Sequence, residues 1–450
     1  MTINRNGLLS ADLDVPVVLP TLNLDFANSQ ELDPRITFSR GSIGTFVNKN
    51  GLIETAAANI PRFDYDPISG ECRGLLIEES RSNYFWGTQT GNGGSVTDGT
   101  VTGADGVTAK KFVPTLGNTS FPSIYSFTPY TFSVANGGTV DISFSGYFAA
   151  IADGLYVPDI VVEFNTGNTS NYIFAELLPN LSNGTVLQKT LSGALGFSEL
   201  IAPQITLMPF GMYKVTWSIR YTQGATTRDR VHFYIQCRKK TSSSTATGTY
   251  YADGKNGFQF SCVQYEVGAF PTSYIPTTTS SVTRSAELAE MTGTNFSSWY
   301  NQTEGTFFFD GTLPFITNDT LNRVPFGVSN GYNFSNSMYV SKGSTSLGLG
   351  FSVINNNVGQ LQGNNGITVM TSSRFKIASA VADKNIYFCG YGGTINKPSR
   401  PSATIPTVNR LTLGKEPWNL STLNPIIGTI RKFAYYPKAL SPAQLQYLTQ

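Results

Sequence analysis

In the stretch Met212–Tyr221, MYKVTWSIRY, apolar and polar residues alternate from Tyr213 onward. One face of this alternation carries only large apolar or aromatic side chains, namely Tyr213, Val215, Trp217, Ile219 and Tyr221. A period of two is typical of a β-strand that lays one face on a hydrophobic core. We therefore predict a strand over these residues, with Trp217 buried.

Two neighbouring stretches, Val140–Phe148 and Val231–Cys237, alternate in the same way and are separated by turns rich in Gly and Asn. Short strands of this kind, with few helical segments between them, favour an antiparallel β-sandwich over 85–276. A second series of short apolar segments follows: Gly305–Asp310, Val324–Val328, Met338–Val340, Phe375–Val381, Ile386–Phe388, Arg410–Leu413 and Gly428–Tyr436. The predicted fold class is all-β, with two antiparallel sandwiches at 85–276 and 290–450.

The regions outside the two sandwiches have different signatures. Residues 1–84 show little periodicity but many turn signals, such as Asn50-Gly51 and Asp66-Pro67. We expect an extended segment there, which docks on other chains or wraps along a sandwich. Residues 277–289 are rich in Thr and Ser and are predicted to be a linker.

One helix is predicted, at the C-terminus. Ser441 is a good N-cap residue, Pro442 suits the first helical position, and Gln444 completes a capping box. Leu440 and Leu445 are spaced as a hydrophobic staple around this start. The helix is short, so we expect it to depend on the sandwich beneath it.

The composition excludes several classes of protein. Only 13% of the 450 residues are charged and the net charge is +2, which argues against a nucleic-acid-binding scaffold. No apolar run is long enough to span a bilayer, and we expect no signal peptide. The four cysteines form no Cys-x-x-Cys pair, so we predict buried free thiols in a protein assembled in a reducing cytosol.

The sequence offers little for catalysis. His232 is the single histidine, no Gly-x-Ser-x-Gly elbow occurs, and we expect His232 to be half-exposed on a strand. Glu78 and Glu79 would point to opposite faces of a strand. Asp64 and Asp66 share a face but lie among turns, where they favour bonds to the backbone. We predict that the protein is not an enzyme, although carboxylates from distant strands could still meet.

Metal binding also lacks a motif. Asp310, Asp319 and Asp383 lie at expected strand ends or in loops and could supply oxygen ligands to calcium. Their spacing matches no EF-hand, and loop carboxylates usually bond their own backbone. We predict no cofactor and no metal site, with calcium left open.

Aromatic residues beside amides are the remaining candidates for a binding site. An aromatic face can cover the apolar face of a sugar ring while Asn fixes its hydroxyl groups. The candidate carbohydrate-binding residues in expected loops are Trp418, Asn419, Tyr332, Asn333, Trp299 and Tyr300. The alternative is that such residues anchor loops or fill a contact between subunits.

Two segments of the second sandwich resemble the concanavalin A-like or laminin-G-like jelly roll. Arg374–Thr394 reads as a strand, a tight polar turn and a returning strand, similar to a hairpin of that family's ligand-facing sheet. Asn424–Thr449 resembles its closing strand and terminal helix. The resemblance implies that 290–450 is a jelly roll.

Two other segments resemble proteins of tailed bacteriophages. Pro61–Phe85 is similar to a segment that recurs in tail fibres and other virion proteins. Phe258–Glu287 resembles the end of a carbohydrate-binding-module-like sandwich found in the same proteins. The resemblance implies a homotrimeric tail fibre or host-attachment protein of the virion, which contacts other virion proteins through 1–84. The open alternatives are a polysaccharide-degrading tailspike and a capsid decoration or adaptor protein.

Overall fold

The computed structural model describes residues 2–3, 9–10, 18–86, 92–125, 129–152, 154–166, 172–191, 196–242, 245–313, 323–342, 348–361, 367–368, 374–390, 403–418 and 428–450. Within these ranges the strands pair antiparallel, as in the ladders β15–β20, β16–β21, β27–β36 and β29–β30. The described helices are short: α1 (Phe26–Ser29), α2 (Thr294–Ser297) and α3 (Pro442–Leu448). The all-β prediction is confirmed.

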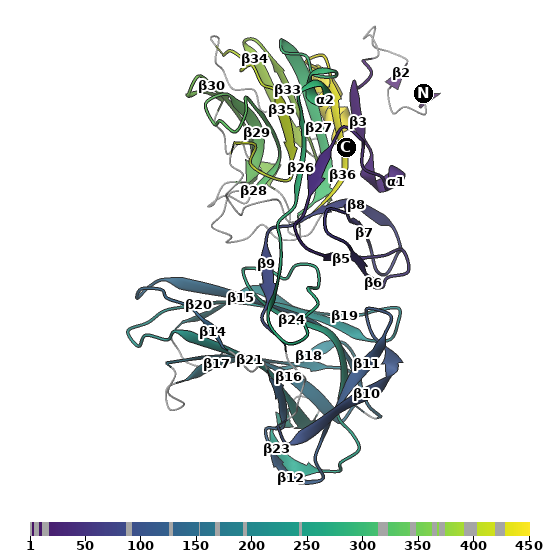
Figure 1. Ribbon diagram of the computed structural model, residues 1–450, viewed down its shortest axis with the longest axis vertical. Coiled ribbons are helices and arrows are strands. Elements are labelled where there is room, and N and C mark those ends of the chain that lie inside the picture. Colours follow the sequence, from purple (N-terminus) through teal and green to yellow (C-terminus); the bar gives the residue numbers. More distant parts are fainter. Residues whose placement is uncertain are drawn as a thin grey trace.

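The first sandwich forms the lower body in Figure 1 and consists of two sheets. The β15 sheet contains, in spatial order, β10 (Gly94–Thr102), β11 (Thr108–Pro114), β24 (Phe258–Val267), β15 (Thr139–Ala150), β20 (Tyr213–Thr222) and β19 (Phe197–Leu207). The β16 sheet contains β13 (Ser123–Tyr125), β21 (Arg230–Lys240), β16 (Tyr156–Asn165), β17 (Ile173–Asn180) and β18 (Thr185–Leu191), with β14 (Tyr130–Thr131) and β22 (Ala246–Thr247) paired to β21. A short ladder joins β12 (Gly117–Ser120) to β23 (Thr249–Ala252).

The core between these two sheets follows the alternation in the sequence. Trp217 on β20 is 1% exposed and lies in one cluster with Phe144, Phe233 and Tyr265. The three strands expected from periodicity are β15, β20 and β21, so those predictions are confirmed. The four cysteines are free and buried, also as predicted.

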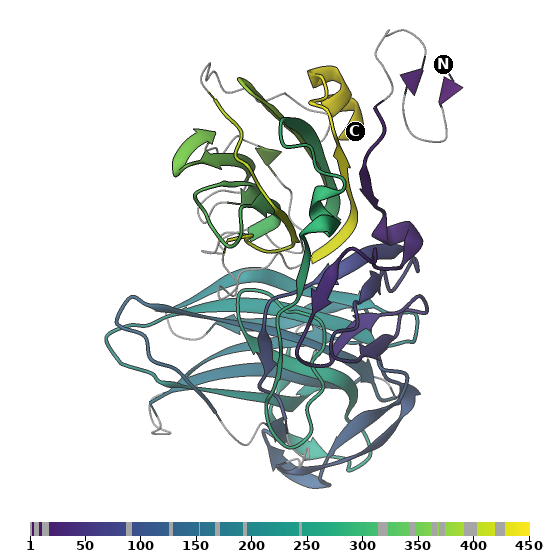
Figure 2. The same cartoon turned by 45° about the horizontal axis from the view of Figure 1, so that its top comes forward.

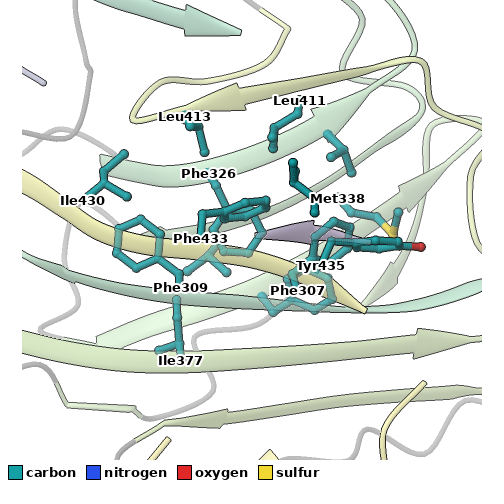
Figure 3. Close-up of a cluster of buried hydrophobic side chains, with 14 of the residues drawn as sticks. Phe307, Phe309, Phe326, Met338, Ile377, Leu411, Leu413, Ile430, Phe433 and Tyr435 are labelled. Carbon is teal, nitrogen blue, oxygen red and sulfur yellow. The ribbon is translucent and has the colours of Figure 1, made fainter. Parts of the chain in front are cut away.

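The second sandwich is the upper body in Figure 1. Its β28 sheet contains, in spatial order, β31 (Val358–Leu361), β30 (Gly348–Asn355), β29 (Ser337–Lys342), β28 (Arg323–Ser329), β35 (Arg410–Leu413), β26 (Leu288–Thr292) and β4 (Thr37–Ser39), with β32 (Ile367–Thr368) on β30. Its β27 sheet contains β34 (Asn385–Gly390), β33 (Arg374–Ala382), β27 (Glu304–Thr312), β36 (Gly428–Tyr436), β8 (Cys72–Ile77) and β7 (Phe63–Tyr65), with β3 (Leu22–Leu24) on β36. Figure 3 shows their shared core, where Phe307 and Phe433 from one sheet meet Phe326 and Met338 from the other.

The N-terminal segment supplies strands to both sheets of the second sandwich. Strands β3, β7 and β8 join the β27 sheet, and β4 joins the β28 sheet through β26. A hairpin of β5 (Gly44–Val47) and β6 (Ile53–Ala56) and a ladder of β1 (Thr2–Ile3) and β2 (Leu9–Ser10) complete this region. Strands β3, β4, β7 and β8 are therefore built into the second sandwich, and the purple N-terminal segment lies beside the upper body in Figure 2. The expected boundary at residue 84 does not separate these strands from that domain.

The chain passes between the two sandwiches twice, and the two passages pair with each other. Strand β9 (Arg81–Asn83) and strand β25 (Val282–Arg284) form an antiparallel ladder, which bridges the two bodies in Figure 1. The described strands of the first sandwich all lie between 94 and 267. That sandwich is thus inserted into a discontinuous domain, and the expected linker 277–289 contains β25 and the start of β26.

A buried network of charges fixes the junction between the sandwiches. Glu287 accepts hydrogen bonds from Arg40 (2.9 Å) and from both Nε and Nη2 of Arg62 (2.7 Å each). Arg62 also pairs with Glu78 at 2.8 Å, and Arg284 lies 3.2 Å from the same carboxylate. These five residues, which we call the junction network, connect the N-terminal segment to both strands that follow the first sandwich.

The C-terminal helix α3 begins as predicted. Ser441 and Gln444 form a reciprocal capping box with Pro442 at the start of the helix, while Leu440 and Leu445 are both buried. Leu445 lies in a cluster with Cys389 and other residues on the outer face of the β27 sheet. That sheet, which includes the hairpin expected to face a ligand, is covered by α3 at this point. None of the described helices has the length and apolar character needed to cross a bilayer.

Candidate functional site

The most exposed of the predicted aromatic residues lies in the loop between β28 and β29. Asn330-Gly331 turns the chain here, with Gly331 at φ 62°, a conformation that favours glycine. Tyr332 and Phe334 follow and are 43% and 42% exposed. Two large rings exposed within three residues of one loop form a local apolar patch, and patches of this kind mark interaction sites more often than single exposed rings do.

Two charged residues hold the ring of Tyr332 in place. The Cζ atom of Arg410 lies 3.6 Å from the ring centroid, close enough for a strong cation–π contact. The Tyr332 hydroxyl donates to a carboxylate oxygen of Glu290 at 3.2 Å, and Glu290 lies 3.6 Å from Arg410. Because Arg410 covers one face of the ring, the exposed fraction belongs to the other face and the ring edge.

Phe334 belongs to a three-ring cluster beside this loop. Its centroid lies 5.0 Å from that of Trp418, and Trp418 lies 4.5 Å from Tyr339, both in edge-to-face geometry. Tyr339 stands on β29 between the core residues Met338 and Val340, so its side chain points away from the core. Tyr332, Phe334, Tyr339 and Trp418 form what we call the aromatic surface, on the outer face of the β28 sheet.

A close contact between Pro417 and strand β28 positions Trp418. The preceding Pro417 lies against β28, where its carbonyl accepts a hydrogen bond from Ser329 Oγ at 3.2 Å. A Cβ atom at Gly327 would come within 2.7 Å of the Pro417 ring. Glycine at 327 therefore permits the approach that brings Trp418 over the outer face of the sheet.

The amides expected to assist the aromatic residues have mixed placements. Asn333 is exposed, and its side-chain oxygen accepts from the backbone N–H of Ser335 at 2.8 Å, which shapes the loop. Asn419 lies outside the described residues. The sequence patterns did not identify three residues of this site, namely Phe334, Tyr339 and Arg410. One signal was present, since Tyr339 stands between two apolar residues of a strand and this position indicates an outward side chain.

The third predicted pair lies in the core. Trp299 is 3% exposed and packs edge-to-face on Tyr435 at 5.1 Å. Tyr300 stacks on Phe296 at 4.7 Å and also contacts Tyr435. Trp299 is buried in the core of the second sandwich and Tyr300 is half-buried against the same cluster, which corrects the expectation that the pair lies in an accessible loop.

The titratable groups weighed for catalysis have structural partners. Asp64 accepts a hydrogen bond from the Val47 N–H, and Asp66 accepts from two N–H groups of its own turn. Glu78 and Glu79 follow β8 and lie on no strand, contrary to the expectation. Glu78 accepts a hydrogen bond from Ser273, while Glu79 pairs with Arg81 and Arg323. His232 is half-buried on β21, and burial lowers its pKa.

The acidic residues considered for calcium are not gathered in one place. Asp310 pairs with Arg374 through two hydrogen bonds of 2.7 and 2.5 Å. Asp383 accepts a long bond from the Ile405 N–H at 3.5 Å, and Asp319 lies outside the described residues. In the described part of the chain, no group of three or more His, Cys, Asp or Glu residues is arranged to hold a metal ion.

Comparisons with known proteins give structural neighbours only. No family model matches the chain, and no curated protein matches it significantly in sequence. Solved structures that align with it include the CBM40 of a Ruminococcus gnavus IT-sialidase (15% identity, 33% of this chain and 84% of that chain, TM-score 0.26). Domains LG4-5 of the mouse laminin alpha1 chain (9%, 72% and 91%, 0.22) and a Trypanosoma rangeli sialidase (9%, 76% and 60%, 0.28) also align. TM-scores this low place the chain in none of these families.

Proposed function

We propose that this protein binds a glycan without cleaving it, and that the aromatic surface is where the glycan rests. The main support for the proposal is the position of the Tyr332 ring. Arg410 packs on one face of this ring, and the other face is open to solvent. A ring held rigidly in advance loses little entropy when a sugar stacks on it. Phe334 follows two residues after Tyr332 and packs against Trp418, which adds further aromatic rings to the proposed site.

The proposed setting is the virion of a tailed bacteriophage, where the protein is a homotrimeric tail-associated protein that attaches to a host surface glycan. The support is the resemblance of Pro61–Phe85 and Phe258–Glu287 to segments of such proteins. Ile43 and Ile60 in the N-terminal segment are 45% and 52% exposed, which suits contact with a neighbouring virion subunit. The second sandwich would then carry recognition outward.

The test is binding of the full-length protein to purified host surface polysaccharide, measured by isothermal titration calorimetry. We expect Tyr332→Ala to weaken binding by about fivefold, because an aromatic stacking contact is worth roughly 1 kcal/mol. The matched control is Tyr251→Ala, since Tyr251 is 64% exposed on the first sandwich and lies outside the aromatic surface. Equal affinity of wild type and Tyr332→Ala would remove the aromatic surface from the proposal.

The same incubation separates binding from cleavage. A non-catalytic protein leaves the number of reducing ends unchanged over hours at saturating protein. An increase in reducing ends would instead favour the polysaccharide-degrading tailspike. No binding to any host glycan, together with normal incorporation into particles, would favour the capsid decoration or adaptor protein.

A further inference from the structure

A cavity of about 470 Å³ lies between the first sandwich and the N-terminal strands of the second. One wall is the outer face of the β15 sheet, with Ser145, Tyr147 and Lys214. The facing wall comes from β7, the turn that follows it and the start of β36, with Asp64, Pro67 and Thr429. The volume is in the range of small-molecule sites, which is roughly 300–1,000 Å³. The cavity contains none of the residues of the aromatic surface.

The two walls are held together by direct contacts. Ile53 on β6 donates its backbone N–H to the Ala104 carbonyl at 2.7 Å, and its side chain packs on an apolar cluster that contains Tyr147. Thr45 on β5 donates its hydroxyl to the Tyr274 carbonyl at 2.5 Å. The junction network lies beside these contacts through Glu78, which also lines the cavity. The cavity is therefore formed before any ligand arrives, which lowers the entropy lost on binding.

Lys214 is the unusual residue of the first wall. Its alternating strand directs it to the outer face of the β15 sheet, where its Nζ lies 5.9 Å from the ring centroid of Tyr147. Among the described residues it has no hydrogen bond and no ion pair. Burial lowers the pKa of Lys214, and the charge of Asp64 across the cavity opposes that shift. An ammonium group that has no hydrogen-bond acceptor in the described part of the protein can donate to a ligand in the cavity.

Only one carboxylate oxygen of Asp64, on the second wall, accepts a hydrogen bond. Its Oδ1 accepts from the Val47 N–H at 2.8 Å, while its Oδ2 lies 3.9 Å from the nearest guanidinium nitrogen of Arg73, beyond hydrogen-bond distance. Burial raises the pKa of Asp64, against the effects of the Val47 bond and the Arg73 charge. One carboxylate oxygen is thus available as an acceptor opposite the Lys214 donor.

We infer that this cavity binds a small neutral polyhydroxylated molecule, one or two sugar rings in size. Sugar hydroxyls both donate and accept, so one ligand can satisfy Asp64 and Lys214 together. A ligand with a net charge would meet a like charge on one of the two walls, and an apolar ligand would leave both charged groups unsatisfied. Tyr147, which lines the cavity, supplies an apolar contact for the ring of a sugar.

The experiment is calorimetric titration of the full-length protein with maltose, lactose and cellobiose, and with 3′-sialyllactose as a charged comparison. We expect at least one neutral disaccharide to bind, and to bind more tightly than the charged sugar. Lys214→Met, which keeps the aliphatic stem, should weaken that binding about tenfold or more, as hydrogen bonds to charged groups do. Asp64→Asn should act similarly, because the amide oxygen can still accept from Val47.

Two controls make the result decisive. Lys255→Met removes an exposed lysine from the same sandwich and should leave the affinity unchanged. Tyr332→Ala should also leave it unchanged, so this site and the aromatic surface can fail separately. Absence of binding by all three neutral sugars would overturn the inference, and so would an affinity that neither Lys214→Met nor Asp64→Asn alters in a protein that melts like the wild type.

Discussion

Glu78 shows how a buried charge ties the stability of this protein to pH. Burial alone would raise the pKa of Glu78, but the charges of Arg284 and Arg62 and hydrogen bonds from Ser273 hold it at about 2, against an ordinary value of 4.5. Because the folded-state pKa is lowered, ionised Glu78 stabilises the fold above about pH 4.5, and this stability is lost as the pH falls toward 2. The full effect is roughly 3 kcal/mol.

We expect Glu78→Gln to lower the free energy of unfolding by about 3 kcal/mol or more at pH 7, because it leaves buried arginine charges without compensation. Urea unfolding at pH 7, 4.5 and 3 should show the gap between wild type and variant narrowing at the lowest pH. Glu54→Gln is the control, as Glu54 is exposed on the same segment and should change stability by less than about 0.5 kcal/mol. A gap that stays constant with pH would contradict the assigned role of Glu78.

Two aromatic residues, Trp299 and Tyr332, show why the sequence alone could not locate the candidate site. Trp299 and Tyr332 both stand beside polar residues in short non-periodic stretches, so nothing local distinguishes them. Trp299 is buried because α2 ends just before it and turns its ring toward Tyr435, which is 136 positions further along the chain. Tyr332 stays exposed because Arg410 occupies the space beneath it. Both outcomes depend on contacts between distant residues.

Helix α3 is the clearest case in which neighbouring residues of the sequence specify the structure of an element. Its capping box and proline fix the start, and its buried Leu445 fixes its position on the β27 sheet. We expect Leu445→Asp to lower the melting temperature of the second sandwich by several degrees or more, since it buries an unpaired carboxylate. Ala443→Asp places the same charge on the exposed first turn, where it is favourable or neutral. Equal melting of the two variants would mean that α3 is not packed as described.

The strands differ in how far the sequence could predict them. Strands β15, β20 and β21 are ten residues or longer and alternate cleanly, so each shows its own periodicity. Strands β3 and β4 are three residues each and pair with partners some 250 to 410 positions later in the chain. A segment that short has no measurable period, and its pairing is decided by the tertiary fold. For this reason the sequence of residues 1–84 indicates only an extended segment.

Because the second domain is discontinuous in sequence, we can predict which isolated fragments of the chain fold. The segment 290–450 lacks β3 and β8, which place Leu22, Leu24, Leu75 and Ile77 in the core of the second sandwich. Loss of each such side chain costs about 2–5 kcal/mol, against a total stability of about 5–15 kcal/mol. We expect the isolated 290–450 fragment to lack a cooperative thermal transition.

The matched fragment is 85–276, which contains both sheets of the first sandwich and its core residue Phe85, and which should fold on its own. Circular dichroism and dispersion of amide signals by NMR would compare the two. A cooperatively folded 290–450 fragment would contradict the integration of the N-terminal strands into the second domain.

We propose the aromatic surface of the second sandwich as the glycan-binding site. The most direct measurement is a structure of the full-length protein with a saturating oligosaccharide prepared from the host surface polysaccharide. We predict sugar density stacked on the free face of Tyr332 and extending toward Phe334 and Trp418. A well-occupied oligosaccharide found elsewhere, with the aromatic surface empty or covered by a neighbouring subunit, would contradict the claim.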